Sequence, residues 1–130
     1  MNPLLQILIV EDDEALRETL ADLLMPEYCV HTAANGIEAF EMVKSIHIDV
    51  VLTDVCMANG SGIELLDWIR ARHPTTPTVI LITGHSQTAT AEAIEKGAYC
   101  VLTKPFTRKS LIDILQSLYE SKITIQKANC

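Results

Sequence analysis

The sequence predicts a three-layer α/β fold built on a five-stranded parallel sheet. Strand-like and helix-like patterns alternate five times along its 130 residues, and this alternation favours parallel strands with helices on both faces. The runs ILIV, VVLT and TVILIT are hydrophobic at almost every position, as expected for strands covered on both sides. No repeat, low-complexity segment or linker interrupts the pattern, which therefore predicts one domain.

The expected strands are short and differ in polarity. They span residues 7–10, 28–33, 50–53, 78–83 and 99–103. The second of them, YCVHTA, mixes polar and apolar residues. This mixture indicates a strand at the edge of the sheet.

The segments between the strands carry helical patterns. The first helix is marked by Leu16, Leu20, Leu23 and Leu24 on one face and is ended by Pro26. The next three are expected at residues 36–45, 61–72 and 86–97, and the last carries apolar residues at positions 111, 114, 115 and 118. We expect the domain to occupy residues 1–122, with residues 123–130 after the last helix as a C-terminal tail or the start of a linker.

Composition and charge argue against several classes of protein. Hydrophobic residues make up 48% and charged residues 21% of the chain, the balance of a soluble globular protein. No apolar stretch approaches the length of a membrane span, and the N-terminus does not resemble a signal peptide, so a cytoplasmic location is expected. The formal net charge of −7 argues against direct nucleic-acid binding, which normally uses a basic face.

The four cysteines are scattered along the chain. Cys29, Cys56, Cys100 and Cys130 form no CxxC pair and have no neighbouring His at zinc spacing. We interpret them as reduced thiols, three of which lie in or beside expected strands as small core residues.

Polar residues stand where four of the five expected strands end. The first strand is followed by Glu11, Asp12 and Asp13, the third by Asp54, the fourth ends in Thr83, and the fifth is followed by Lys104. In open parallel α/β sheets, ligands bind outside the carboxyl ends of the strands. These residues are therefore expected to converge on one rim of the sheet.

This set of residue types suits phosphoryl transfer. Clustered carboxylates resist ionising together unless a cation lies among them, and Mg²⁺ takes one or two carboxylates while it keeps several waters. A Lys ammonium and a Thr hydroxyl can bind phosphate oxygens, and an Asp carboxylate can attack phosphorus to form an acyl phosphate. We therefore interpret Asp54 as a candidate phosphoacceptor.

Each residue of this set also has a structural interpretation. Asp12 or Asp13 can cap the first helix, and Asp54 can be a turn residue. Thr83 can be an ordinary strand former, and Lys104 can be solvated. These alternatives stay open for single residues, whereas the joint placement at four strand ends favours a functional site.

Four sequence motifs carry a family resemblance. The stretches ILIVEDDE, VVLTDVCMANGSG, ITG and LTKPF occur in this order within about residues 5–120. With these motifs the chain resembles the receiver domain of bacterial two-component response regulators. The resemblance implies a flavodoxin-like fold with strand order 2-1-3-4-5. It also implies a regulatory domain rather than an enzyme, one that catalyses only its own phosphorylation and dephosphorylation.

The resemblance implies a role for each acidic residue. Asp54 is similar to the phosphoacceptor, which takes a phosphoryl group from the phosphohistidine of a histidine kinase. Glu11 and Asp12 resemble the acidic pair that binds Mg²⁺, Asp12 directly and Glu11 mainly through water. Asp54 itself and the main-chain carbonyl of Cys56 complete the implied metal ligands.

The switch residues are also implied by the resemblance. Lys104 resembles the lysine that contacts a phosphoryl oxygen, and the Lys104–Pro105 peptide bond is expected to be cis. Thr83 resembles the switch hydroxyl, which moves toward the phosphoryl group on activation. The aromatic switch position, three residues before the lysine, is Val101, which has no ring to turn. Tyr99 shares its face by strand alternation and is expected to substitute in part.

The loop after the acceptor departs from the family pattern. The family commonly has Pro where Ala58 stands and Gly where Asn59 stands. A different loop conformation is therefore expected, with Gly60 and Gly62 supplying flexibility.

The implied partners are a sensor histidine kinase or a phosphotransfer protein, and a downstream effector that the sequence does not name. A homodimer through the last helix and the fifth strand is a further expectation. Neither a membrane nor a nucleic acid is expected as a direct partner of this domain.

Other functions fit the sequence less well. A Mg²⁺-dependent phosphohydrolase of the haloacid-dehalogenase type needs a second acid two residues after its nucleophile, where this chain has Cys56. A flavodoxin-like FMN carrier needs a phosphate-binding loop where this chain has EDDE, and a dinucleotide site needs the absent GxGxxG motif. A receiver that acts only as a binding module stays open as an alternative.

Overall fold

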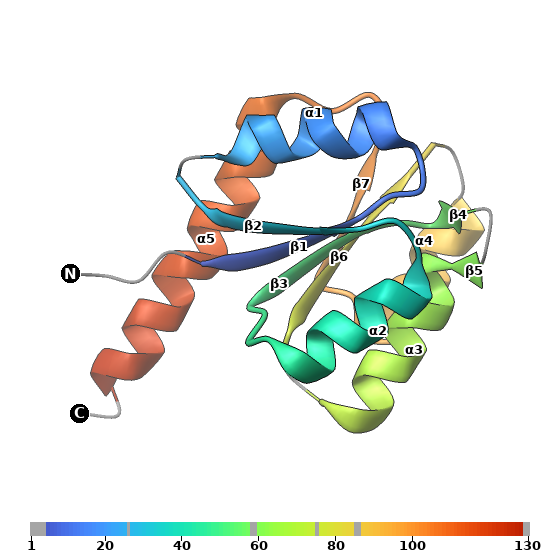
Figure 1. Cartoon of the computed structure of the whole chain (residues 1–130). Helices are drawn as coiled ribbons and strands as arrows, with labels where there is room; N and C mark the ends of the chain where they lie inside the picture. Colours follow the sequence, from blue (N-terminus) through green and yellow to red (C-terminus); the bar gives the residue numbers. More distant parts are fainter. Residues whose placement is uncertain (1–4, 26, 58–59, 75, 85–86, 129–130) are drawn as a thin grey trace.

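The structure is a computed structural model that describes residues 5–25, 27–57, 60–74, 76–84 and 87–128. For residues 56–57, 60–61, 87–90 and 119–128 it describes the backbone alone. Pro26, Ala58 and Asn59, which the sequence singled out, lie outside the described residues. The helices and strands follow one another in the alternating order that the sequence predicts (Figure 1).

Five parallel strands form the central sheet. They are β1 (Gln6–Val10), β2 (Cys29–Ala33), β3 (Val50–Asp54), β6 (Thr78–Thr83) and β7 (Cys100–Thr103). The order across the sheet is β2-β1-β3-β6-β7, which is 2-1-3-4-5 when these five strands are counted alone. The predicted fold class, the strand order and the edge position of the polar second strand are confirmed.

Helices cover both faces of the sheet. On one face lie α1 (Glu14–Leu24) and α5 (Arg108–Ala128), and on the other lie α2 (Gly36–Ser45), α3 (Gly62–Arg72) and α4 (Gln87–Glu95) (Figure 1). The three-layer arrangement is therefore confirmed. α4 ends at Glu95, two residues before the end of the expected range 86–97, and Ser86, the expected start, lies outside the described residues.

Each strand contributes alternate residues to two separate cores. In β1, Ile7 and Ile9 pack with α1 and α5, whereas Leu8 and Val10 pack with α2 and α3. All four side chains are buried. This alternation explains why the central strands β1, β3 and β6 are hydrophobic at almost every position, because neither of their faces meets water.

Local capping signals fix the starts of two helices. The Asp13 carboxylate accepts the backbone N–H of Leu16 at 3.1 Å and is the N-cap of α1. At the start of α2, Asn35 accepts the N–H of Glu38, and the Glu38 carboxylate accepts the N–H of Ala34. The second arrangement resembles a capping box and ties the turn after β2 to the helix.

The last helix differs from the sequence-based expectation. Residues 123–130 were expected to follow this helix, but α5 continues to Ala128. Between residues 111 and 128 the sequence has neither Gly nor Pro, so no residue in this stretch ends the helix. The expectation that the helix ends before residue 123 is wrong, whereas the domain boundary at residue 122 stays a prediction.

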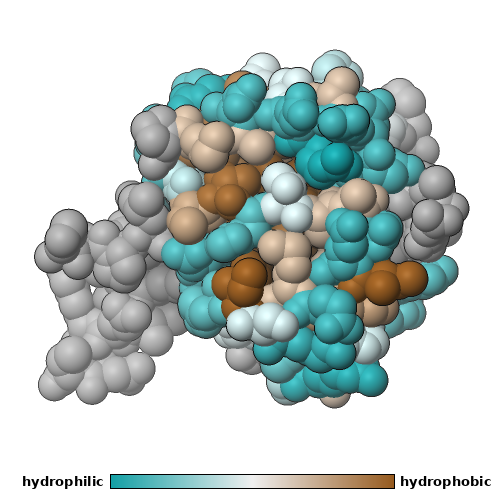
Figure 2. Space-filling model, in the orientation of Figure 1, coloured by the Kyte–Doolittle hydropathy of each residue, from teal (hydrophilic) through white to brown (hydrophobic). Residues whose placement is uncertain are grey.

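Hydrophilic residues cover much of the face of the molecule seen in Figure 2. Figure 2 shows small, separate hydrophobic areas among hydrophilic residues on one face of the molecule. Among the described helices, none is both long and apolar enough to cross a membrane. Cys29 and Cys100 begin β2 and β7, are partly buried and are free thiols, as expected.

The buried face of α3 packs in the core between the sheet and the helices α2, α3 and α4. We expect this face to contribute much of the stability of that core. Ile69 on α3 is fully buried, whereas Ile37 on α2 is 68% exposed. Ile69→Ala should lower the free energy of unfolding by about 2–5 kcal/mol because it leaves a cavity. Ile37→Ala makes the same change at the surface and should alter it by less than about 0.5 kcal/mol. Urea unfolding of both variants measures the difference, and equal losses would contradict the assigned core.

Candidate functional site

Four strands bring their carboxyl ends to the same rim of the sheet. Val10 lies beside Thr53 across β1 and β3, so the next residues, Glu11 and Asp54, are neighbours. Asp54 in turn lies beside Ile82 of β6. The predicted convergence follows from this parallel register.

Buried polar residues gather at this rim. Among the described residues, the buried polar or charged ones are Glu11, Thr53, Asp54 and Thr83. All four stand at or directly after the carboxyl end of a strand. Burial of polar or charged groups without compensation is unfavourable, so this concentration favours a functional site over an ordinary core.

An ion pair between Asp54 and Lys104 lies at the centre of the site. The Lys104 Nζ donates to Asp54 Oδ2 at 2.9 Å, and 10% of the Asp54 side chain and 37% of the Lys104 side chain are exposed. The hydrogen bond to Asp54 raises the pKa of Lys104, and the charges of Glu11 and Asp12 add to this effect. The Lys104–Pro105 peptide bond is cis, as expected.

Glu11 is a buried carboxyl next to the candidate acceptor. Its exposed fraction is 4%, and burial is the main reason that its pKa rises to about 7. A hydrogen bond to Asp54 and the charge of that carboxylate raise the pKa further, whereas the N–H of Asp13 and the charge of Lys104 lower it. The site thus holds two acids that resist being ionised together.

Asp12 and Asp13 have different places in the structure. Asp13 serves as the N-cap of α1, as expected for one of the two. Asp12 is exposed, and its charge acts on Lys104. Glu11 is thus the buried member of the predicted acidic pair and Asp12 the exposed one, and their role in binding a metal stays a prediction.

Two residues support the backbone of the site: Arg17, which sequence reasoning missed, and Gly62, for which it expected a different role. Arg17 Nη1 donates to the main-chain oxygen of Glu11 at 2.8 Å. A Cβ at Gly62 would collide with the main-chain oxygen of Asp54 and with Leu81. Gly62 was expected only to make the loop flexible, but this position needs glycine because the backbone passes so close to the acceptor.

The loop after the acceptor contains a hairpin that the sequence did not predict. β4 (Cys56–Met57) pairs with β5 (Gly60–Ser61) in antiparallel orientation, with Cys56 opposite Ser61. Cys56 is thus fixed in a strand two residues after Asp54. Its carbonyl as a metal ligand stays a prediction.

The predicted switch residues lie in or beside β6 and β7: Thr83 is the last residue of β6, Val101 is the second residue of β7, and Tyr99 precedes β7. Thr83 is buried, and its main-chain oxygen accepts the N–H of Lys104 at 2.8 Å. Val101 is partly buried and packs against the core between the sheet and the helices α2, α3 and α4. Tyr99 is 49% exposed, so in this structure its ring does not fill the space of an inward aromatic switch residue.

The donor set fits a hydrated Mg²⁺ ion. Among the described residues, no three His, Cys, Asp or Glu side chains form a group that could hold a metal ion by themselves. Mg²⁺ does not need such a cage, because it binds through one or two carboxylates and keeps several waters. The raised pKa of buried Glu11 beside Asp54 is the electrostatic condition that a divalent cation would relieve.

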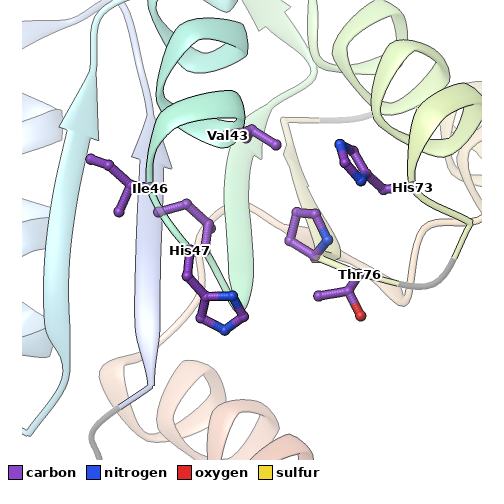
Figure 3. Close-up of a pocket in the computed structure, with 7 residues that line it drawn as sticks. Val43, Ile46, His47, His73 and Thr76 are labelled. Atoms are coloured by element: carbon purple, nitrogen blue, oxygen red, sulfur yellow. The ribbon is translucent and has the colours of Figure 1, made fainter.

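A separate pocket lies at the opposite end of the sheet. Its volume is about 170 Å³, and its lining includes Ile46, His47, His73 and Thr76 (Figure 3). These residues precede β3 and β6, whereas the acidic rim follows the ends of these strands. The pocket therefore forms no part of the candidate site.

Sequence comparison relates this chain to response regulators. Residues 7–116 match the model of the response regulator receiver domain. Regulatory protein AtoC of Escherichia coli is 36% identical over 118 residues, which are 89% of this chain and 25% of AtoC. The chain spans from about a quarter to 57% of the length of the first curated relatives that it matches.

Solved structures share the fold over nearly the whole chain. The signal receiver domain of an HD domain-containing protein from Pseudomonas fluorescens Pf-5 has a TM-score of 0.86 and 28% identity, and the match covers 98% of this chain and 95% of that one. The beryllofluoride-activated NtrC4 receiver domain dimer has a TM-score of 0.81 and 33% identity, with coverage of 89% and 97%.

Glu11 should make the stability of the Mg²⁺-free protein depend on pH. Its pKa is about 7 in the folded chain and 4.5 in the unfolded chain, so the folded state binds the proton more tightly and loses stability as pH rises from about 4.5 to 7. Between roughly pH 6 and pH 8, the free energy of unfolding of wild type should fall by about 1 kcal/mol more than that of Glu11→Gln. Urea unfolding with a chelator measures both, and parallel pH profiles would contradict the raised pKa.

Gly62→Ala should destabilise the fold and displace the acceptor. The new Cβ meets the Asp54 main-chain oxygen and Leu81, and overpacking of this kind costs about 1–3 kcal/mol. Gly36→Ala is the matched control, because a Cβ there has no neighbour within 4 Å and should be neutral or stabilising by up to about 1 kcal/mol. Thermal unfolding compares the two, and an equally stable Gly62→Ala variant would show that the close approach is not a constraint.

Proposed function

The chain belongs to the response regulator receiver domain family, and we propose that it is a phosphorylation switch whose phosphoacceptor is Asp54. The observation that carries the proposal is the buried Asp54 carboxylate, which lies 2.9 Å from the Lys104 ammonium and beside Glu11. The phosphoryl donor is the phosphohistidine of a sensor histidine kinase or a phosphotransfer protein. The domain acts in the cytoplasm.

The transfer forms one bond and breaks another. A carboxylate oxygen of Asp54 attacks phosphorus, the phosphorus–nitrogen bond of the donor breaks, and the histidine leaves with the electron pair. The product is an acyl phosphate on Asp54. Lys104, which already contacts the carboxylate, is placed to bind a phosphoryl oxygen as negative charge gathers there.

Glu11, Asp12, Asp54 and the main-chain carbonyl of Cys56 would hold a Mg²⁺ ion. The ion would supply positive charge that lets an anionic phosphoryl group approach an anionic acceptor. Burial and, to a smaller degree, the neighbouring Asp54 raise the pKa of Glu11. A divalent cation would offset both effects, so Glu11 would lose its proton when the cation binds.

The domain catalyses only reactions of its own Asp54. It assists the transfer onto this residue and the later attack of water on the acyl phosphate, which restores the carboxylate. Its output is a change of a partner surface, which we assign to α4 and β7. This change begins when the Thr83 hydroxyl moves toward the phosphoryl group.

The partner surface includes the region around Tyr99 and Val101. Val101 packs in the core and has no ring to reorient, so coupling to the surface depends on Tyr99, which is half exposed. The similar NtrC4 receiver domain is a dimer in its beryllofluoride-activated form, which supports a homodimer of this chain as one outcome of activation. The downstream effector is a protein that distinguishes the two states of this surface.

Intact-mass measurement tests the chemistry directly. The protein is incubated with acetyl phosphate, with and without Mg²⁺. Wild type should gain the mass of one phosphoryl group only when the metal is present, and Asp54→Ala should gain none. The matched control is Asp67→Ala, which removes an exposed aspartate of α3 and should leave the adduct unchanged.

Two results would contradict the proposal. An adduct that persists in Asp54→Ala would place the phosphoryl group on another residue. An adduct that forms equally well in a chelator would remove the assigned role of Glu11 and Asp12.

A further inference from the structure

The C-terminal end of α4 is joined to α3 by an arginine with three acceptors. Arg70 Nε donates to the main-chain oxygen of Gly97 at 3.2 Å, just after α4. Its two other nitrogens donate to the main-chain oxygens of His73 at 3.0 Å and Pro77 at 2.6 Å. One partly buried guanidinium thus ties the end of α3, the start of β6 and the turn after α4 together.

The backbone conformation of Gly97 and its lack of a side chain allow this contact. Its φ is +105°, and a Cβ there would lie 3.2 Å from Arg70 Cδ and Nε. A side chain at position 97 would therefore strain the backbone and displace the guanidinium. The N–H of the next residue, Ala98, bonds back to Ala93 of α4 at 2.9 Å, so the turn is continuous with the helix.

A second contact joins the same two helices one turn away. The Lys96 Nζ donates to both carboxylate oxygens of Asp67 on α3, at 2.8 and 3.1 Å. Asp67 and Arg70 are three residues apart and so lie on one face of α3. Both contacts reach the same end of α4, which lies beside α3 in Figure 1.

The other end of α4 is attached differently. It follows β6, whose last residue is Thr83, through a short connection. The helix sequence QTATAEAIE consists mostly of small and polar residues, and among its described side chains, at residues 91–95, Ala93 lies in the buried core. A helix with few large anchors can move at low cost, provided that it is not restrained elsewhere.

We propose that Arg70 and Lys96 are positioning residues of the switch, which keep the C-terminal end of α4 fixed to α3 while its N-terminal end moves. Gly97 is the pivot of this motion. The inference rests on the proposed function, because the motion starts from the phosphoryl group on Asp54 through Thr83. The inference adds the direction in which the motion of α4 diminishes: the displacement is largest at the N-terminal end of the helix and decreases toward Gly97.

Amide chemical shifts with and without beryllium fluoride and Mg²⁺, used as the phosphoryl mimic, test the proposal. In wild type, residues 84–93 should shift strongly, whereas residues 96–98 should shift no more than those of α2, the internal reference. In Arg70→Gln and in Lys96→Gln, the shift changes at 96–98 should rise toward those of residues 91–93. A residue with a purely structural role would alter stability without redistributing these mimic-dependent changes.

Matched controls use the same substitutions elsewhere. Arg72→Gln removes an arginine of α3 that lies over the Trp68 ring at 4.6 Å, and Lys44→Gln removes an exposed ion pair with Glu41 on α2. Both should retain the wild-type pattern. If they redistribute the shifts as the Arg70 and Lys96 variants do, the effect is not specific and the proposal is wrong.

The remaining outcomes separate this inference from the proposed function. Large changes at residues 96–98 in wild type, or an unaltered pattern in both Arg70→Gln and Lys96→Gln, would overturn the pivot but leave the phosphorylation switch intact. If the mimic shifts no residue around Asp54, the proposed function fails and the pivot fails with it.

Discussion

The ion pair between Asp54 and Lys104 is the interaction on which the rest of the site depends. The two residues stand at the ends of β3 and β7, which are separated in the sheet by β6. Their 2.9 Å contact therefore requires that all three strands run parallel and end at the same rim. A buried carboxylate without a partner is strongly unfavourable, so Lys104 stabilises the buried Asp54 carboxylate that the proposed transfer requires.

The same pair leaves an electrostatic imbalance that suits a switch. Lys104 provides one positive charge, whereas Glu11, Asp12 and Asp54 bring three acids to the rim. The pKa of Glu11 is raised to about 7, mainly by burial and further by Asp54. A divalent cation would restore the balance, and an incoming phosphoryl group would change it again. In the proposed switch, the binding of a proton, a metal and a phosphoryl group would thus be coupled at one place, and the ends of β6 and β7 would connect that place to α4.

The sequence predicted what depends on local pattern and on parallel topology. Residues 78–83 and 36–45 form the expected strand and helix because their apolar spacing and boundary residues agree, and Glu11, Asp54 and Lys104 meet because parallel strands end together. The contacts of Gly62 with Asp54 and of Arg70 with Gly97 were not predictable, since each depends on a particular path of the backbone through space. The sequence also has no strong local pattern that predicts the hairpin after Asp54 or the extension of α5 to Ala128.

The most direct measurement of the central claim is the position of the phosphoryl group in the chain. After phosphorylation with acetyl phosphate and Mg²⁺, borohydride reduces an acyl phosphate to an alcohol, and peptide mass spectrometry then locates the reduced residue. The account predicts a single reduced aspartate, at position 54. Reduction at Asp12, Asp13 or another acid, with Asp54 unmodified, would contradict it.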